Sequence, residues 1–365
     1  MPAPYVGKDG VVEGPLYDFC LPAEYAACSL LPEVRAMALS LFTELGIPWH
    51  AGVGDGPSNH LLDSQVQCVN ALGQMVRDPD RLQRAFAHVL GTSEVLEVEP
   101  GRFLTFEYIG GTDYFNEARA GQRVRGAHCT SVDAAFLHRT GDGVVELVLL
   151  EWKYTESYRL RVPNSAKDAV HRRRYQAALT APDGPVRDDL LDIVDLLDEP
   201  FYQLMRQQLL AHELEKDRVH GADRVRVAHV LPAANTAYQQ SMHRPAQRDL
   251  GASVAEVWAG LLRRPDRFLS LDSALFCDPR ITSKEYAERY GDRLAWDRAE
   301  VLRLCGGDVE DHLYAHLDYD GDVDVRDEGV ELIVTGQGTV LEYPFSLLEL
   351  YDLAREVEAE AEERA

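Results

Sequence analysis

The chain has 365 residues, of which 45% are hydrophobic, so it can bury one large core or two smaller ones, and wholesale disorder is excluded. It contains no apolar run of about eighteen residues, as a membrane span needs, and its N-terminus lacks the basic and apolar regions of a secretion signal, so we expect a cytoplasmic protein. The formal net charge of -24 argues against a general affinity for nucleic acid.

The charge is unevenly distributed along the chain. Residues 121–187 carry eleven Lys and Arg against seven Asp and Glu, whereas residues 306–331 carry one Arg against ten acidic residues. A locally basic segment can still contact phosphate, while the acidity elsewhere limits non-specific binding. The six cysteines form no CxxC pair and no zinc-like spacing with histidine, so we expect them to be small core residues in a reducing compartment.

The N-terminal part of the chain has helical periodicity. Residues 31–46 form an amphipathic pattern that ends at Gly46. A second helix is predicted over residues 60–77, with Gln65 on or beside its apolar stripe. A third is predicted over about residues 79–90.

The period changes in the middle of the chain. Residues 94–99 and 102–109 alternate like strands, and residues 123–139 form a further predicted strand. Residues 144–155 are the most apolar run in the protein and are apolar on both faces up to Glu151. This pattern predicts a central strand that helices cover on both sides.

Helices and one more strand follow. A helix that Asn164 or Ser165 caps is predicted to run to about residue 180. Further predicted elements are a helix over 201–217, a strand over 224–231, a helix over 253–263, a hairpin of 329–334 and 339–343, and a final helix from about 345. The order of helix, three strands, helices and strand predicts an α/β sandwich.

We expect three regions in this chain. Residues 1–58 are predicted to be an N-terminal helical segment that packs on a core of residues 59–245. Residues 246–365 are predicted to be a mainly helical C-terminal region with a small hairpin. No linker-like composition marks the boundary near residue 245.

Two charged motifs are predicted to meet on one face of the sheet. Glu151 and Lys153 are two residues apart on a strand, so their side chains point to the same face. A three-residue loop at 141–143 sets a hairpin register that places Asp133 directly opposite Glu151. Two carboxylates and an amine then converge on one patch.

This combination of groups suits metal-dependent hydrolysis of a phosphodiester. Asp133 and Glu151 can hold Mg²⁺, a hard cation that takes oxygen ligands, and Mn²⁺ can substitute for it. The metal polarises a phosphoryl oxygen and lowers the pKa of a bound water. Lys153 can orient or activate that water, or offset charge on the phosphate. The alternative is a cross-strand ion pair, but unpaired charge at the end of a doubly buried strand is costly, which favours a functional role.

The same residues resemble a known family. Asp133 and Glu151-x-Lys153 match the PD-(D/E)XK signature, with Val132 in place of its proline. The surrounding segments are NHLLDSQVQCVNAL at 59–72, FEYIGGTDYFNEAR at 106–119, RGAHCTSVDAAF at 125–136 and LLEWKYTESY at 149–158. Together they resemble bacterial restriction endonucleases of the PD-(D/E)XK nuclease superfamily. The resemblance implies a restriction-endonuclease-like mixed sheet flanked by helices, and magnesium-dependent cleavage of phosphodiester bonds.

The resemblance also implies a third acidic ligand from an early helix. Here the helix predicted over 60–77 offers Asp63 and Gln65, and an amide coordinates a metal only through its carbonyl oxygen. Glu107 and Glu117 are alternatives. For each of these residues, a structural role is an equal expectation.

The segment that follows the predicted site is basic. We expect it to contact phosphate groups of nucleic acid, with a solvated helix face as the alternative. Its residues are Lys167, Arg172, Arg173 and Arg174. Gln203, Gln207 and Gln208 on the later helix are expected to border the cleft.

The sequence therefore predicts a Mg²⁺-dependent endonuclease of the PD-(D/E)XK type. Its expected partner is nucleic acid, with DNA preferred over RNA, and its expected role is bacterial defence against foreign DNA. A membrane partner is not expected, and a homodimer is considered. The alternatives are a catalytically inactive pseudo-nuclease that binds nucleic acid, and an acidic interaction or scaffold protein.

Overall fold

The computed structural model describes residues 2–7, 12–118, 121–127, 129–160 and 164–291, and the backbone of 323–328, 331–336 and 339–346. The chain forms two compact units, which are described separately. The first unit comprises Met1–Phe276 and Arg280–Thr282, and the second comprises Cys277–Pro279 and Ser283–Ala365.

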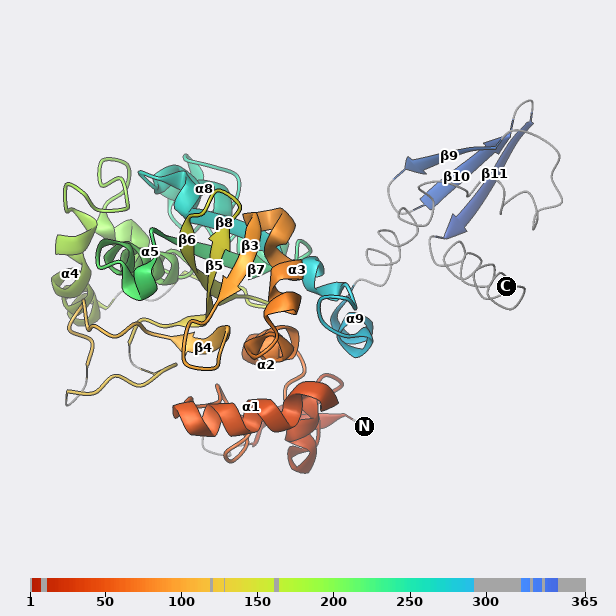
Figure 1. Ribbon diagram of the computed structural model, residues 1–365, viewed down its shortest axis with the longest axis horizontal. Coiled ribbons are helices and arrows are strands. Elements are labelled where there is room, and N and C mark those ends of the chain that lie inside the picture. Colours follow the sequence, from red (N-terminus) through yellow and green to blue (C-terminus); the bar gives the residue numbers. More distant parts are fainter. Residues whose placement is uncertain are drawn as a thin grey trace. The chain divides into compact units, whose positions relative to one another are not determined.

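A six-stranded mixed sheet lies at the centre of the first unit (Figure 1). The strand order is β3-β5-β6-β7-β8, and β4 also pairs with β5. Strands β3, β4 and β6 are antiparallel to β5, whereas β7 and β8 continue parallel to β6. Their bounds are β3 Thr92–Leu96, β4 Leu104–Tyr108, β5 Val132–Thr140, β6 Val145–Trp152, β7 Arg224–Leu231 and β8 Phe268–Asp272.

Helices flank this sheet, which confirms the predicted mixed α/β architecture. The α-helices of the first unit are α1 Pro32–Leu45, α2 Ser64–Leu72, α3 Pro79–Leu90, α4 Ser165–Leu179, α5 Phe201–Lys216, α6 Thr236–Gln239, α7 Pro245–Arg248 and α8 Val254–Leu261. The 3₁₀ helices that lie within it are η2 Ala23–Ser29, η3 Gly73–Val76, η4 Ile193–Leu196, η5 Val219–Gly221 and η6 Pro265–Arg267. A further 3₁₀ helix, η7 Ser273–Cys277, follows β8.

Both faces of the sheet are covered, with α4 and α5 on one side and α3 on the other (Figure 1). On the α5 side, Leu147 and Leu149 of β6 share a buried core with Leu204 of α5. On the α3 side, the rings of Phe86 and Phe136 pack with their centroids 4.6 Å apart. Strand β6 is buried along all but its first residue, so it is the central strand that its apolar run predicts.

The predicted helix starts and ends agree closely with the structure for several elements. Helix α1 has Pro32 in its first turn and ends at Gly46 in the left-handed conformation, the usual signals for a helix start and end. The Asn164 side chain accepts a hydrogen bond from the backbone N–H of Lys167 and caps α4. The helix predicted over 60–77 is instead two pieces, α2 and η3, and the Asp63 side chain caps the first of them.

The N-terminal segment contains a hairpin that the sequence did not predict. Strands β1 (Ala3–Val6) and β2 (Val12–Tyr17) pair antiparallel ahead of η2 and α1. Among the described residues, no single helix is long and apolar enough to span a membrane; η2 and α1 meet that criterion only as a pair bent by 103°.

The C-terminal region adds strands to the predicted helices. The sequence predicts that the core ends at residue 245. Strand β8 lies after this residue and extends the main sheet by pairing with β7. The domain boundary near residue 245 stays a prediction. The predicted strand over 123–139 begins only at Val132.

The second unit contains α9 (Lys284–Tyr290) and a three-stranded antiparallel sheet in the order β11-β10-β9. Its strands are β9 Val323–Glu328, β10 Glu331–Gly336 and β11 Thr339–Ser346, so the predicted hairpin is present. The helix predicted from about residue 345 lies almost wholly outside the described residues, which end with β11 at Ser346.

Candidate active site

The strand registers place three acidic residues in one row across the sheet. The pair Ala134 and Leu150 on β5 and β6 puts the preceding Asp133 opposite the following Glu151, as the loop at 141–143 predicts. On the other side of β5, the pair Phe106 and Ala134 puts Glu107 of β4 opposite Asp133. The row therefore runs Glu107, Asp133, Glu151, and we call it the acidic row.

The row continues onto β7 with a histidine that the sequence did not point to. His229 pairs with Glu151 in the parallel register of β6 and β7, and it is fully buried. Its Nε2 lies 3.1 Å from the hydroxyl oxygen of Tyr238. Burial and the positive charge of Lys153 lower the pKa of His229 to about 3, so its imidazole is uncharged at neutral pH.

Lys153 and Glu151 are buried together at the end of β6. The Nζ of Lys153 donates to Oε1 of Glu151 at 2.6 Å, and the amide nitrogen of Gln207 on α5 donates to the other carboxylate oxygen. Lys153 is only 6% exposed and Glu151 only 1%. Gln207, one of the residues expected to border the cleft, thus contacts Glu151 and fixes the orientation of its carboxylate.

Glu107 has a strained backbone and two side-chain donors. Its φ of 47° lies in the left-handed region, which a residue with a long side chain seldom adopts outside turns and functional sites. Its carboxylate accepts hydrogen bonds from Gln65 at 3.0 Å and from Ser131 at 2.8 Å. Gln65 of α2 therefore reaches the acidic row through Glu107, and Glu107 supplies the third carboxylate.

The carboxyl groups of the acidic row outnumber the positive groups that could neutralise them. Burial and the neighbouring charge of Glu151 raise the pKa of Asp133 well above its usual value, although the backbone N–H of Trp152 donates to it at 2.6 Å. Burial also raises the pKa of Glu107. Burial alone would lower the pKa of Lys153, but the charge of Glu151 outweighs it and raises that pKa well above normal. One buried ammonium thus faces three carboxyl groups.

The chemistry of this donor set suits a hard divalent cation. In the part of the chain that the structure describes, no three His, Cys, Asp or Glu side chains are grouped so as to hold a metal ion. Mg²⁺ is often bound through only one or two carboxylates, with water and substrate phosphate completing its shell. Asp133 and Glu151 offer such oxygens, and a cation would relieve the excess negative charge of the row.

Glu117 has other partners. Its carboxylate accepts hydrogen bonds from the backbone N–H and the hydroxyl of Thr130 and from the hydroxyl of Tyr175, and it lies 3.4 Å from a guanidinium nitrogen of Arg206. It is 4% exposed. These contacts indicate a structural role that anchors α4 and α5 to the loop before β5.

The predicted phosphate contacts lie on α4. Lys167 and Arg173 are exposed, and Arg172 and Arg174 are partly exposed. His171 and Tyr175 of the same helix are buried and pack towards Tyr202 of α5. The basic side chains therefore lie away from the face of α4 that is packed against α5.

The comparisons with known proteins give one match. Residues 4–291 match a family described as restriction endonuclease associating with ARP. This match covers the whole acidic row and nearly all of the first unit. No curated protein and no solved structure shows a significant match to the chain.

Proposed function

The chain belongs to the family of restriction endonucleases associating with ARP, and we propose that it is a metal-dependent endonuclease of the PD-(D/E)XK type. The single observation that carries this proposal is the acidic row with the buried ammonium of Lys153 beside it. Carboxylates that are kept together in a buried site without enough compensating charge are costly, and such clusters are typical of functional sites.

In the proposed mechanism, Asp133 and Glu151 would hold Mg²⁺, and Glu107 adds negative charge beside them. The bound ion would polarise a phosphoryl oxygen and lower the pKa of a water molecule. Gln207 keeps the Glu151 carboxylate in one orientation, and Trp152 does the same for Asp133 through its backbone N–H. The site is thereby arranged before substrate arrives.

Lys153 acts as a hydrogen-bond donor in this mechanism. Because the charge of Glu151 raises the pKa of Lys153 well above normal, the side chain stays protonated at neutral pH. A protonated amine has no lone pair with which to accept a proton from water. Lys153 therefore stabilises charge that develops on the phosphate and does not take the proton of the attacking water.

We propose DNA as the substrate and the basic side chains of α4 as its phosphate contacts. An acidic protein needs such a local basic surface to bind a polyanion. The family description also names an association with ARP, and we propose that this partner helps to bring the enzyme to its substrate.

Incubation with nucleic acids tests the proposal. Plasmid, linear duplex, single-stranded DNA and RNA are each incubated with the protein and Mg²⁺, Mn²⁺ or EDTA. We expect cleavage of DNA with either metal and none with EDTA, and loss of cleavage in Asp133→Asn. Cleavage that persists in EDTA or in Asp133→Asn would place the activity elsewhere.

One observation favours an inactive nucleic-acid-binding protein as the second candidate. Both carboxylate oxygens of Glu151 are engaged, one by Lys153 and one by Gln207. If this arrangement persists when metal is added, only the remaining lone pair of each Glu151 oxygen is left to coordinate the ion, which weakens metal binding. Binding of DNA with no Mn²⁺ affinity and no cleavage would support this second candidate.

A further inference from the structure

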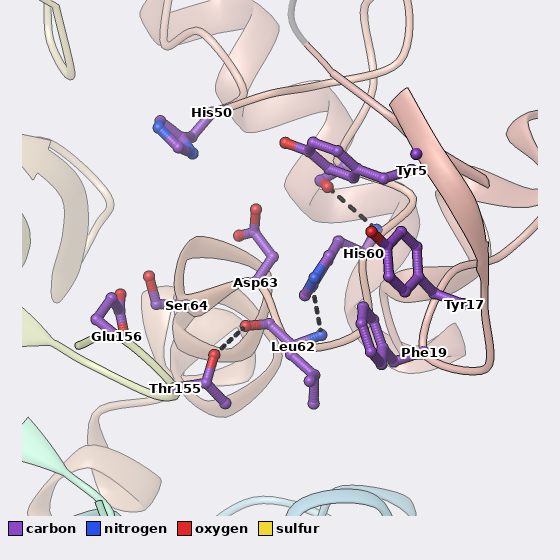
Figure 2. A pocket seen from close by; sticks show the side chains of 12 residues that line it. Tyr5, Tyr17, Phe19, His50, His60, Leu62, Asp63, Ser64, Thr155 and Glu156 are labelled. Atoms are coloured by element: carbon purple, nitrogen blue, oxygen red, sulfur yellow. Dashed lines mark hydrogen bonds between the residues drawn. The ribbon is translucent and has the colours of Figure 1, made fainter. Parts of the chain in front are cut away.

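A pocket that is separate from the acidic row opens in the first unit (Figure 2). It has a volume of about 630 Å³. Its walls come from the N-terminal hairpin, from residues just before and at the start of α2, and from the loop that follows β6. None of the proposed catalytic residues lies in its lining.

One wall of the pocket is aromatic. The rings of Tyr17 and Phe19 stack at a centroid distance of 5.0 Å and an interplanar angle of 23°. His60 packs against Phe19 at 4.9 Å and against Tyr5 at 5.6 Å. All four rings are partly exposed, but they are inclined to one another, by 51° between Phe19 and His60 and by 89° between Tyr5 and His60, so a planar ligand can stack on one exposed ring face and contact the edges of the others.

The opposite wall is polar and acidic. Asp63 and Glu156 supply carboxylates, and Ser64 supplies a hydroxyl group. In Figure 2 the carboxylate of Asp63 lies between His50 and His60, and Glu156 lies beyond Ser64. Carboxylates accept hydrogen bonds from amines and repel phosphate, so this wall suits the amino group of a ligand rather than an anion.

The pocket and the acidic row share two chain segments. Glu156 follows Lys153 by three residues, which span at most about 11 Å of chain. Ser64 directly precedes Gln65, whose amide donates to Glu107 of the row. The backbone carbonyl of Leu62 also accepts a hydrogen bond from the Thr155 hydroxyl, which joins these two segments. A strand bound at the row would therefore bring a neighbouring nucleoside to this pocket, since duplex bases are spaced by about 3.4 Å.

We propose that this pocket binds one unstacked nucleobase of the nucleic acid, and that it prefers a base with an exocyclic amine. The base stacks on one exposed ring face of the aromatic wall formed by Tyr17, Phe19 and His60, and its amine donates to Asp63 or Glu156. Adenine, cytosine and guanine have such an amine, whereas thymine and uracil do not. This inference rests on the proposed nuclease function, because it places a base of that substrate.

Binding of short single-stranded homopolymers in EDTA tests the proposal without cleavage. Wild-type protein is titrated with oligomers of deoxyadenosine, deoxycytidine and thymidine, and with an oligomer that carries 2-aminopurine, whose fluorescence rises when the base is unstacked from its neighbours. We expect tighter binding of the deoxyadenosine and deoxycytidine oligomers than of the thymidine oligomer. Phe19→Ala should weaken binding at least about five-fold, as expected for the loss of one stacking platform.

Leu16→Ala is the matched control. Leu16 neighbours Tyr17 on β2, points to the other side of the strand and is 66% exposed, so its removal should leave binding unchanged. Asp63→Asn tests the polar wall, because asparagine keeps the cap of α2 and adds a donor. Combined with Glu156→Gln, which removes the other carboxylate of the wall, it should abolish the preference over thymidine even if Phe19→Ala does not fold.

The outcomes separate this inference from the proposed function. If wild type cleaves DNA with Mg²⁺ but Phe19→Ala, Asp63→Asn combined with Glu156→Gln, and Leu16→Ala all bind and discriminate as wild type does, the pocket is not a base site and the nuclease stands. If wild type binds none of the oligomers and cleaves nothing, both proposals are overturned.

Discussion

At the scale of single residues, Lys153 has two roles. It is the proposed electrostatic donor to the phosphate, and it neutralises the buried Glu151. Lys153→Ala should reduce DNA cleavage by about 10²–10³, the usual effect of removing one electrostatic donor from an active site. It should leave Mn²⁺ affinity close to that of wild type, because the carboxylates remain. Plasmid nicking and Mn²⁺ binding by calorimetry measure the two effects.

Stability must be followed in the same variant, since Lys153 also neutralises the buried Glu151. The loss of one partner of a buried pair costs roughly 3–5 kcal/mol. Lys153→Met, which keeps most of the buried volume, isolates the missing charge from the cavity. Lys284→Ala, at a lysine that is 79% exposed, is the control and should change neither cleavage nor melting temperature. Full cleavage by Lys153→Met would show that the amine is purely structural.

Asp63 gives a pH-dependent prediction. Burial, only partly offset by the backbone N–H of Val66, raises the pKa of Asp63 from 3.8 to about 6. The folded protein therefore holds this proton more tightly than the unfolded chain, and the carboxyl group lowers stability as pH rises from about 4 to above 6. The full cost at pH 7 is at most about 3 kcal/mol. Asp63→Asn, which keeps a good helix cap, should thus be more stable than wild type at pH 7 and equal to it near pH 4.

Urea titrations of both proteins across this pH range give the measurement. Asp78→Asn is the matched control, because Asp78 also caps a helix but its side chain is 41% exposed and paired with Arg81. It should show no gain at pH 7. A stability difference for Asp63→Asn that does not change with pH would show that Asp63 titrates normally.

At the scale of elements, α4 is expected to be the phosphate-binding helix. Replacing Arg172, Arg173 and Arg174 by Ala should weaken DNA binding and reduce the slope of log affinity against log salt by up to about 0.9 for each phosphate that is no longer neutralised. The control replaces three exposed arginines elsewhere, with the same change in net charge. These are Arg187, Arg218 and Arg263, each of which is paired with an aspartate. Equal slopes in the two triple variants would mean that α4 does not contact phosphate.

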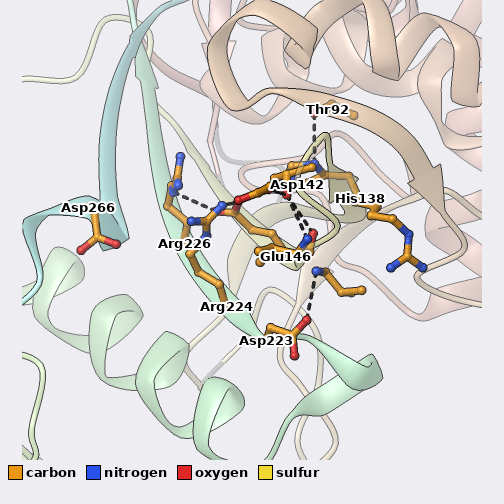
Figure 3. Close-up of polar contacts among 12 residues, drawn as sticks. Thr92, His138, Asp142, Glu146, Asp223, Arg224, Arg226 and Asp266 are labelled. Atoms are coloured by element: carbon orange, nitrogen blue, oxygen red, sulfur yellow. Dashed lines mark hydrogen bonds and ion pairs between the residues drawn. The ribbon is translucent and has the colours of Figure 1, made fainter.

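An ion network centred on the buried Glu146 lies at the end of β6 that is remote from the acidic row (Figure 3). It links β5, β6 and β7. The Glu146 side chain is fully buried and its carboxylate lies 2.6 Å from Arg224, 2.8 Å from Arg226 and 3.6 Å from His138. Burial would raise the pKa of Glu146, but His138 and the two arginines outweigh it and lower that pKa. Its contribution to stability is therefore present above the normal value of 4.5 and is lost as pH falls through the lowered pKa.

Glu146→Ala should destabilise the protein by up to roughly 3–5 kcal/mol at pH 7, because it leaves the partly buried Arg224 and Arg226 without their carboxylate. Glu94→Ala removes an exposed cross-strand partner of Arg139 and should cost less than about 1 kcal/mol. Thermal and urea unfolding of the two variants gives the comparison. Similar destabilisation in both would mean that the network is not the main stabiliser of this end of the sheet.

The sequence predicts the centre of the site because one local turn controls it. The Gly-rich loop at 141–143 fixes the register of β5 on β6, and that register alone brings Asp133 opposite Glu151. The position of Glu107 depends on the pairing of β4 with β5, which are separated by a long loop, and on a left-handed backbone at Glu107 itself. Neither leaves a periodic signal, so the sequence alone leaves Glu107 as one of several candidates for the third acid.

Short or irregular strands are the elements that the sequence does not predict. Strand β2 contains Gly14, with φ of 77°, followed by Pro15, and the β1–β2 register shifts after Pro4, so alternation is broken. Strand β8 has only five residues and directly follows a 3₁₀ helix. Its place is decided by pairing with β7 rather than by its own pattern.

At the scale of the whole molecule, the net charge of -24 opposes the approach of DNA. Most nucleic-acid-binding proteins bind more slowly as salt is added, because salt screens attraction. Here the long-range field is repulsive, and only the α4 surface is expected to attract phosphate at short range. The interaction between exposed charges reaches about 30 Å at 0.01 M salt but only about 10 Å at 0.1 M, because added ions screen it.

The association rate with DNA should therefore rise between about 0.01 M and 0.1 M salt, where added ions screen the repulsion of the whole protein. At higher salt it should fall, because the local contacts of α4 are then screened as well. Stopped-flow binding of a fluorescent duplex in EDTA measures this profile. The triple variant of Arg172, Arg173 and Arg174 should keep the rise and lose most of the fall, since it removes only the local attraction. A rate that falls steadily from about 0.01 M would show that the DNA-binding surface dominates the field and that the acidic charge lies where DNA does not approach.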